Sequence, residues 1–376
     1  AAAEAMTLAK RISKSNSNTF YVDEKCYPQT INIINTRAKP LNIKIKVGSA
    51  KDAQKESFFG LLFQYPNSEG VIKDFSQSIN HAHKQNSIVI FATDLLALTL
   101  IKSPGEFGVD IAIGSSQRFG VPLGFGGPHA AFMATKKEYK RSMPGRIVGA
   151  SLDVHGKTAY RLALQTREQH IRREKATSNI CTAQALLAIM AGFFAVYHGP
   201  ERLQSIAKKV NLRTQILAKK ISEKFNLVST DFFDTISVIS NEETDSIIQK
   251  GLNQGINLRK IDSNKIGISL DETTSEKDLS ELISLFTDQT NIDSKTSNLT
   301  SIPKNLLRKS KYLTHPVFHK YQSETEMMRY IKKLHDKDIA LDRSMIPLGS
   351  CTMKLNSASE MLPISWPEFS SIHPFA

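Results

Sequence analysis

The sequence predicts an α/β protein: a large domain built on a mostly parallel β-sheet, followed by a small α+β domain. Between residues 19 and 148, short apolar runs bounded by polar residues alternate with helical segments, a pattern typical of buried parallel strands. After residue 225 the strands and helices become shorter and mixed, which favours a separate α+β unit. Two long helical segments separate these regions.

The expected elements of the large domain follow in chain order. Residues 1–6 (AAAEAM) resemble the middle of a helix, and further helices are expected at 29–35 and 95–102. Strands are expected at 19–22, 43–47, 60–65, 87–92 and 109–113. Ligands of such sheets bind at the carboxyl ends of the strands. Thr93, Asp94 and the loop that begins at Gly114 are therefore expected at a ligand-binding edge.

A long helix is expected at 176–197, and the Gly199-Pro200 pair should separate it from a second helix at 201–225. The small domain should contain three strands, two helices and the helix-ending Gly255, with Thr274 or Ser275 capping the second helix. The strands are predicted at 235–239, 256–259 and 265–270, and the helices at 243–254 and 276–286. A polar linker at 288–301, an amphipathic helix at 323–337 and a loop at 346–376 complete the chain.

Composition excludes several classes of protein. The chain has 376 residues, 40% of them apolar, and no run approaches the about 20 apolar residues that cross a membrane. Cys26, Cys181 and Cys351 form no CxxC pair, so neither a structural zinc site nor any other metal site is expected. The net charge of +13 is scattered over the chain, which argues against nucleic-acid binding.

Other motifs fail on spacing. The Gly156-Lys157-Thr158 triplet is not a phosphate-binding P-loop, because Ser151 stands where the first glycine is required. The glycines at 124–127 lack the third glycine of a dinucleotide-binding fingerprint. His315 and His319 are separated by a proline and have no adjacent glutamate, so capping or surface roles are expected.

Three segments stand out. The first, 114–129, is a Gly- and Pro-rich loop that carries Gln117 and Arg118 but no lysine. The second, 161–184, is either a solvated helix with ion pairs or a segment that touches a ligand or a neighbour. The third, 344–356, is either a structural loop or a loop that feeds an active site; Cys351 has no histidine nearby in sequence.

Four blocks within these regions resemble the glycine decarboxylase, or P-protein, family of the glycine cleavage system. They are SSQRFGVPLGFGGPH at 115–129, MPGRIVG at 143–149, QTREQHIRREKATSNIC at 165–181 and PLGSCTMK at 347–354. A weaker resemblance extends over nearly the whole chain. It implies a fold-type I, aspartate aminotransferase-like architecture that depends on pyridoxal 5′-phosphate (PLP).

The resemblance also implies a division of the chain. Proteins of this family consist of two homologous halves, in one chain or in separate subunits, and only the second half holds PLP. Residues 1–200 would be a degenerate PLP-type large domain, 201–287 the small domain, 288–322 a linker and 323–376 the start of the catalytic half. The chain is thus expected to be a fragment cut at both ends.

The same resemblance suggests roles for particular residues. Gln117 falls where the catalytic copy has its Schiff-base lysine, and an amide cannot form an imine; the lysine is expected beyond residue 376. Arg118 is no substitute, because its guanidinium stays protonated. Asp94 could pair with a pyridinium nitrogen, but a structural strand-end role is the better interpretation. Ser350, Cys351 and Thr352 are the candidates for contact with the cofactor of the second half.

The implied activity is release of CO2 from glycine and transfer of the aminomethyl group to the lipoyl arm of H-protein. The expected partners are glycine, lipoylated H-protein and the other half or subunit, in a dimer or heterotetramer, with no nucleic acid and no membrane. The alternative is a non-catalytic scaffold subunit that pairs with a PLP-bearing one. The compartment would be the cytoplasm in a bacterium, which is preferred, or the mitochondrial matrix in a eukaryote.

Overall fold

The computed structural model describes residues 1–164, 176, 183–287, 301–337 and 357–372. The predicted α/β class is confirmed: a six-stranded sheet forms the large domain and a four-stranded sheet the small one. The order in the large sheet is β2-β1-β3-β4-β5-β6. Strands β1 to β5 are parallel, and the edge strand β6 runs antiparallel to β5.

The strands of the large sheet lie close to their expected positions. Their bounds are β1 Thr19–Asp23, β2 Lys44–Gly48, β3 Gly60–Tyr65, β4 Ile88–Thr93, β5 Ile111–Ser115 and β6 Ala131–Thr135. Every residue of β3 and β4 is buried, as the apolar runs predicted. The centre of the sheet is therefore covered on both faces.

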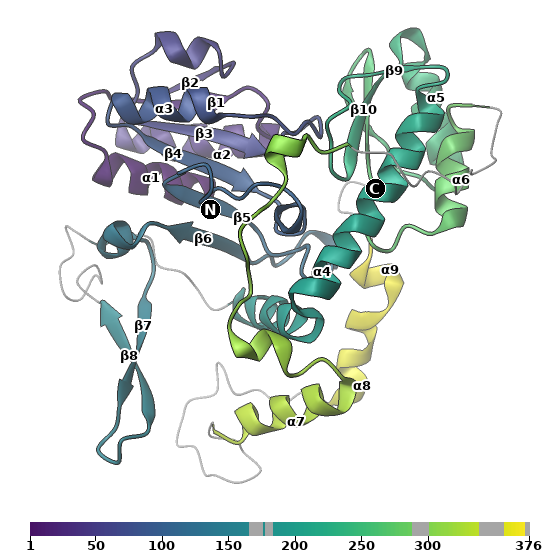
Figure 1. Ribbon diagram of the computed structural model, residues 1–376. Coiled ribbons are helices and arrows are strands. Elements are labelled where there is room, and N and C mark those ends of the chain that lie inside the picture. Colours follow the sequence, from purple (N-terminus) through teal and green to yellow (C-terminus); the bar gives the residue numbers. More distant parts are fainter. Residues whose placement is uncertain (165–175, 177–182, 288–300, 338–356, 373–376) are drawn as a thin grey trace.

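Helices form a layer on each face of the sheet (Figure 1). Helices α1 (Ala2–Ile12) and α2 (Pro28–Ala38) pack on one face through Met6, Leu8 and Ile34. Helix α3 (Ser76–Lys84) and the second part of α4 (Ala185–Ile221) cover the other face. The layered arrangement leaves a pocket at the carboxyl ends of β3, β4 and β5.

The predicted helix at 95–102 is wrong. Only a short 3-10 turn, Ala97–Thr99, forms there. The Asp94 carboxylate accepts the backbone N–H groups of Leu96 and Ala97, and the next residues turn away to pair Ile101 with Leu307 in an isolated β-bridge. This strand-like pairing ends the helical turn.

Two long helices lie on either side of a break within α4, as expected, but the first begins at Ala185 rather than at residue 176 and the second ends at Ile221 rather than at residue 225. Gly199 has φ 63°, and Pro200 starts the second part. A Cβ atom at Gly199 would lie 2.6 Å from the carbonyl oxygen of Phe318, so glycine is required at this crossing.

The small domain contains the predicted α+β elements, but one strand is misplaced and the short strand β9 was not predicted. Its sheet has the order β11-β12-β10-β9. The expected strand at 256–259 is wrong, because Ile256 donates its N–H back to Gly251 and β11 begins only at Arg259. Ser275 caps α6 in a capping box, as expected. The bounds are β9 Asn226–Leu227, β10 Thr235–Ile239, α5 Thr244–Asn253, β11 Arg259–Asp262, β12 Lys265–Ser269 and α6 Glu276–Ser284.

A β-hairpin that the sequence did not predict projects from the large domain (Figure 1). It consists of β7 (Ile147–Leu152) and β8 (Thr158–Leu164). Helix α7 (Glu324–His335) matches the expected amphipathic helix. The expected loop after it contains two single-turn helices, α8 (Ala358–Met361) and α9 (Pro367–Ser370), which corrects that prediction within the described residues.

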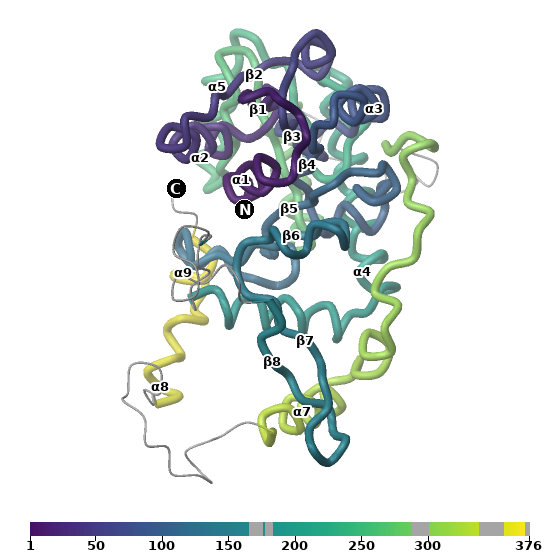
Figure 2. Tube along the Cα trace, turned by 90° about the vertical axis from the view of Figure 1, so that its left-hand side faces the viewer, coloured from purple at the N-terminus to yellow at the C-terminus, as the bar shows by residue number. Residues whose placement is uncertain are grey.

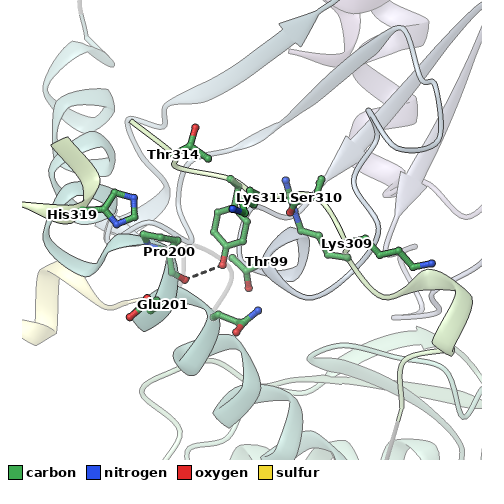
Figure 3. A pocket seen from close by; sticks show the side chains of 11 residues that line it. Thr99, Pro200, Glu201, Lys309, Ser310, Lys311, Thr314 and His319 are labelled. Carbon is green, nitrogen blue, oxygen red and sulfur yellow. Dashed lines mark hydrogen bonds between the residues drawn. The ribbon is translucent and has the colours of Figure 1, made fainter. Parts of the chain in front are cut away.

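Residues 301–322, here called the strap, run along the large domain and cross the break in α4. Tyr312 donates its hydroxyl hydrogen to the carbonyl of Pro200 at 2.9 Å, and Arg308 lies over the Tyr312 ring. A pocket of about 570 Å³ lies between the strap and the second part of α4, with Lys311 and His319 in its wall (Figure 3). His315 accepts the N–H of Val317, a capping role that the sequence suggested. The division into four segments stays a prediction.

Glu106 holds the strap in place, and its loss should destabilise the protein. Its carboxylate accepts the N–H groups of Ser103 (2.8 Å), Lys309 (3.1 Å) and Ser310 (3.1 Å). Burial opposes ionisation, but these bonds lower the pKa of Glu106 to about 2. We expect Glu106→Gln to reduce the free energy of unfolding at neutral pH by about 1–2 kcal/mol, measured by urea denaturation.

The stability that Glu106 contributes is expected to depend on pH. A carboxyl group whose pKa is lowered on folding stabilises the native state above its unfolded pKa, and that contribution disappears as the pH falls toward the folded value. The difference between wild type and Glu106→Gln should therefore shrink between about pH 4.5 and pH 2. Glu201→Gln is the matched control, because it removes an exposed carboxylate from the wall of the pocket between the strap and α4. An equal, pH-independent loss in both variants would contradict the role of Glu106.

Candidate functional site

A pocket of about 530 Å³ lies at the carboxyl ends of β3, β4 and β5. Gln64 is the last but one residue of β3, Thr93 ends β4 and Asp94 follows it, and Gly114 and Ser115 end β5. The sequence placed Thr93, Asp94 and the loop from Gly114 at this edge, and the structure brings them together. The amino ends of α1 and α2 close the pocket from the helical layer, where the N-terminus lies near β5 (Figures 1 and 2).

Arg118 joins the two domains beside this pocket. Its Nε lies 3.4 Å from an oxygen of Asp94, and its Nη1 lies 3.0 Å from an oxygen of Asp234. Asp94 belongs to the large domain, while Asp234 directly precedes β10 of the small domain. The other oxygen of Asp94 accepts the N–H groups of Leu96 and Ala97. Asp94 therefore has a structural role at the strand end.

Charge balance in this cluster is negative, because two carboxylates share one guanidinium. Burial raises the pKa of Asp234 to about 6, against the attraction of Arg118, and Asp94 raises it further. Burial lowers the pKa of Arg118, but the two carboxylates outweigh this and raise it above its ordinary value. Burial, followed by Asp234 and Asp94, also raises the pKa of the Tyr27 hydroxyl. Arg118 thus remains a cation and cannot act as an amine nucleophile.

The structure does not provide a covalent attachment point for PLP in this pocket. Among the described residues, no lysine side chain lines it. Gln117 does line it, and its backbone N–H donates to the hydroxyl of Ser115 at 3.1 Å. Arg118 already forms an ion pair with the Asp94 carboxylate, which a pyridinium nitrogen would need as its own partner. The equivalence of Gln117 to a Schiff-base lysine stays a prediction, but the pocket does not fit a Schiff-base cofactor.

Three polar residues of the pocket escaped the sequence interpretation: Tyr27, Thr30 and Gln64. Gln64 is only 9% exposed, and within the described part of the chain its side-chain amide has no hydrogen-bond partner. The sequence held a signal for two of these residues. Gln64 is the polar residue in the apolar run 60–65, and Tyr27 precedes a proline that starts a helix.

Several predicted site residues lie outside the described residues. Ser350, Cys351 and Thr352 belong to the segment 338–356, and most of the block 161–184 lies in 165–175 and 177–182. Their roles stay predictions. Among the described residues, no group of three His, Cys, Asp or Glu side chains could hold a metal ion. No helix in the described ranges has the length and apolar character needed to cross a membrane.

Comparisons with known proteins point to one family. The family described as "Glycine cleavage system P-protein" matches residues 1–286. Glycine dehydrogenase (decarboxylating) of Cereibacter sphaeroides is 55% identical over 377 residues, which cover 100% of this chain and 39% of the relative. The enzyme of the same name from Pelagibacter ubique is 55% identical over 378 residues, 40% of its length. The chain therefore spans about two fifths of these relatives.

Solved structures agree. A crystal structure of glycine decarboxylase (P-protein) in inhibitor-bound form superposes with a TM-score of 0.68 at 28% identity, covering 76% of this chain and 68% of that one. A C-DES mutant with glycine linked to its PLP cofactor has a TM-score of 0.52 at 13% identity, over 76% of this chain and 79% of that chain, and shows the shared fold alone. The predicted fold-type I class is confirmed. The chain belongs to the glycine cleavage system P-protein family.

Proposed function

We propose that this chain is the non-catalytic portion of an enzyme that releases CO2 from glycine and transfers the aminomethyl group to the lipoyl arm of H-protein. Family membership supports the activity, which the relatives carry in their name. The observation that supports the non-catalytic role is the pocket at the carboxyl ends of β3, β4 and β5, which has no lysine among its described residues. PLP would be bound by a second half that carries the Schiff-base lysine.

Exposed apolar side chains support association with that second half or subunit. The hairpin exposes Val154 to 93% and Tyr160 to 74%, and similar side chains are exposed on α4, α7 and the 357–372 segment. Surfaces of this kind are typical of protein interfaces. The exposed set comprises Val148, Leu152, Val154, Tyr160, Leu186, Ile189, Met328, Ile331, Leu362, Ile364, Trp366 and Phe369. A dimer or heterotetramer in the cytoplasm of a bacterium would fit this proposal.

A separate scaffold subunit that pairs with a PLP-bearing partner is the second candidate, because the same exposed surface would serve it. The downstream gene sequence distinguishes the two candidates. A Gly-rich loop with a Schiff-base lysine in the same reading frame would support one continuous chain.

The proposal predicts that residues 1–376 alone neither bind PLP covalently nor process glycine. After incubation with PLP, the purified chain should lack the absorbance band of an internal aldimine and should not exchange CO2 with the carboxyl group of glycine. Co-expression with the remaining portion of the protein should restore both signals and serves as the control. Glycine–CO2 exchange by the 376-residue chain alone would contradict the proposal.

A further inference from the structure

The strap is a strongly basic segment of the chain. Residues 301–322 contain four lysines and one arginine but no aspartate or glutamate. Three of these cations, Arg308, Lys309 and Lys311, line the pocket of about 570 Å³ between the strap and the second part of α4 (Figure 3). Glu201 is the only carboxylate among the described residues of its wall. With three cations, one anion and histidine counted as neutral, the wall has a net charge of +2.

The three cations have no carboxylate partner within the described part of the chain. Lys309 and Lys311 are exposed, and neither ammonium group forms an ion pair there. The guanidinium of Arg308 donates to two carbonyl oxygens, from Nε to Ser310 at 3.0 Å and from Nη1 to Leu98 at 2.6 Å. A partly buried positive charge without an ionic partner is unfavourable, and an anion in the pocket would compensate it.

Glu106 attracts Arg308 but is engaged elsewhere. Its carboxylate accepts the backbone N–H groups of Ser103, Lys309 and Ser310, and within the described ranges it forms no ion pair with the guanidinium. Burial lowers the pKa of Arg308 more than the attraction of Glu106 raises it. The arginine therefore keeps an uncompensated positive charge at the pocket.

Uncharged hydrogen-bonding groups surround these cations. Ser310 and Thr314 contribute hydroxyl groups from the strap, and Gln204 contributes its amide from α4. The amide oxygen of Gln204 accepts a hydrogen bond from Lys208 at 3.1 Å, which leaves the amide N–H groups available as donors. The second part of α4 starts at Pro200, so the positive end of its dipole belongs to the same wall. Cations, hydroxyl groups and amide donors together suit an oxyanion with several acceptor oxygens.

We propose that the pocket between the strap and α4 binds a dianionic phosphate group non-covalently, through Arg308, Lys309 and Lys311. A dianion matches the net charge of +2, and the tetrahedral oxygens of a phosphate accept hydrogen bonds from several directions. The volume of about 570 Å³ exceeds that of a bare phosphate, so a phosphate ester with a small organic part also fits. This pocket shares no residue with the one at the carboxyl ends of β3, β4 and β5, and the proposal does not depend on the decarboxylation.

Calorimetric titration of the purified chain in phosphate-free buffer at constant ionic strength tests the proposal. Inorganic phosphate or methyl phosphate should bind saturably at one site, and the tighter of the two shows whether the pocket prefers a free or an esterified group. Acetate, a monoanion, should bind at least about tenfold more weakly than phosphate. Bound phosphate should also raise the temperature of thermal unfolding.

Substitutions in the wall should change the affinity in opposite directions. Lys309→Met and Lys311→Met each remove one positive charge and should weaken phosphate binding about fivefold. Glu201→Gln removes the negative charge of the wall and should tighten binding about threefold. Lys304→Met is the matched control, because it removes an exposed lysine of the strap that lies outside the pocket, and it should leave binding unchanged.

The stability of the variants keeps the test decisive. Lys309 and Lys311 are exposed, so without phosphate both variants should unfold at the temperature of wild type. If either lysine variant is less stable, the gain in affinity of Glu201→Gln decides, because misfolding would not produce it. The proposal is overturned if neither phosphate compound binds saturably, if acetate binds as tightly as phosphate, or if Lys304→Met weakens binding as much as Lys309→Met and Lys311→Met.

Discussion

Replacing Gly70 with alanine is expected to lower the free energy of unfolding by about 3 kcal/mol, because two costs combine at this position. Gly70 has φ +87°, a left-handed conformation that is strained for any other residue. A Cβ atom would also lie 2.0 Å from the carbonyl oxygen of Thr235, which is backbone and cannot rotate away. Urea denaturation of the purified variant measures the loss.

The site of this contact explains its importance. Residues 67–72 form the junction between the two domains: Val71 pairs with Phe232 in a β-bridge, and the Ser237 hydroxyl donates to the carbonyl of Glu69 at 2.9 Å. Glu69 is buried and lies 3.0 Å from Lys25 of the large domain and 3.6 Å from Lys265 of the small domain. Displacing Gly70 would therefore disturb the whole junction.

Gly108 provides the matched control for this prediction. Its φ is +78°, but a Cβ atom there would have no neighbour within 4 Å. Gly108→Ala should cost only the conformational strain, about 1 kcal/mol. Equal losses in the two variants would mean that the close approach to Thr235 contributes nothing to the difference between them.

The parallel strands were predictable from sequence because burial on both faces leaves a simple pattern. In β3 and β4 every position is buried, so the apolar runs coincide closely with the strands. The hairpin β7–β8 lacked that signal, since most of its residues are exposed and no core selects their pattern. Its turn left a weaker signal: Asp153 accepts the N–H groups of His155 and Lys157, and Gly156 has φ +75°.

The site was predictable in part. Asp94 and the loop that carries Arg118 could be placed at one sheet edge, because both follow neighbouring parallel strands. Asp234 could not, since its approach to Arg118 depends on how the small domain docks on the large one. The position of α2 beside Gln64 also depends on tertiary packing, which places α1 and α2 on the same face of the sheet.

Removal of Arg118 should also destabilise the protein, because it leaves two carboxylates facing each other across the domain boundary. We expect Arg118→Met to cost about 2–3 kcal/mol at neutral pH, less than a fully buried pair, since 21% of the arginine side chain is exposed. Lys224→Met removes a surface ion pair, with exposures of 53% and 50% for its partners, and should cost at most about 0.5 kcal/mol.

Repulsion between Asp94 and Asp234 as the cause of this destabilisation leads to two further expected results. The double variant Arg118→Met/Asp234→Asn should recover at least half of the loss, because it removes one of the opposing charges. The pKa of Asp234 is already raised to about 6, and it should rise further without Arg118. A raised carboxyl pKa means that the native state binds more protons, so its stability increases as the pH falls through that value. The loss in free energy of unfolding that Arg118→Met causes, measured by urea denaturation, should therefore diminish from pH 7 to about pH 5. A loss that is constant with pH and unaffected by Asp234→Asn would instead indicate lost packing against Phe233.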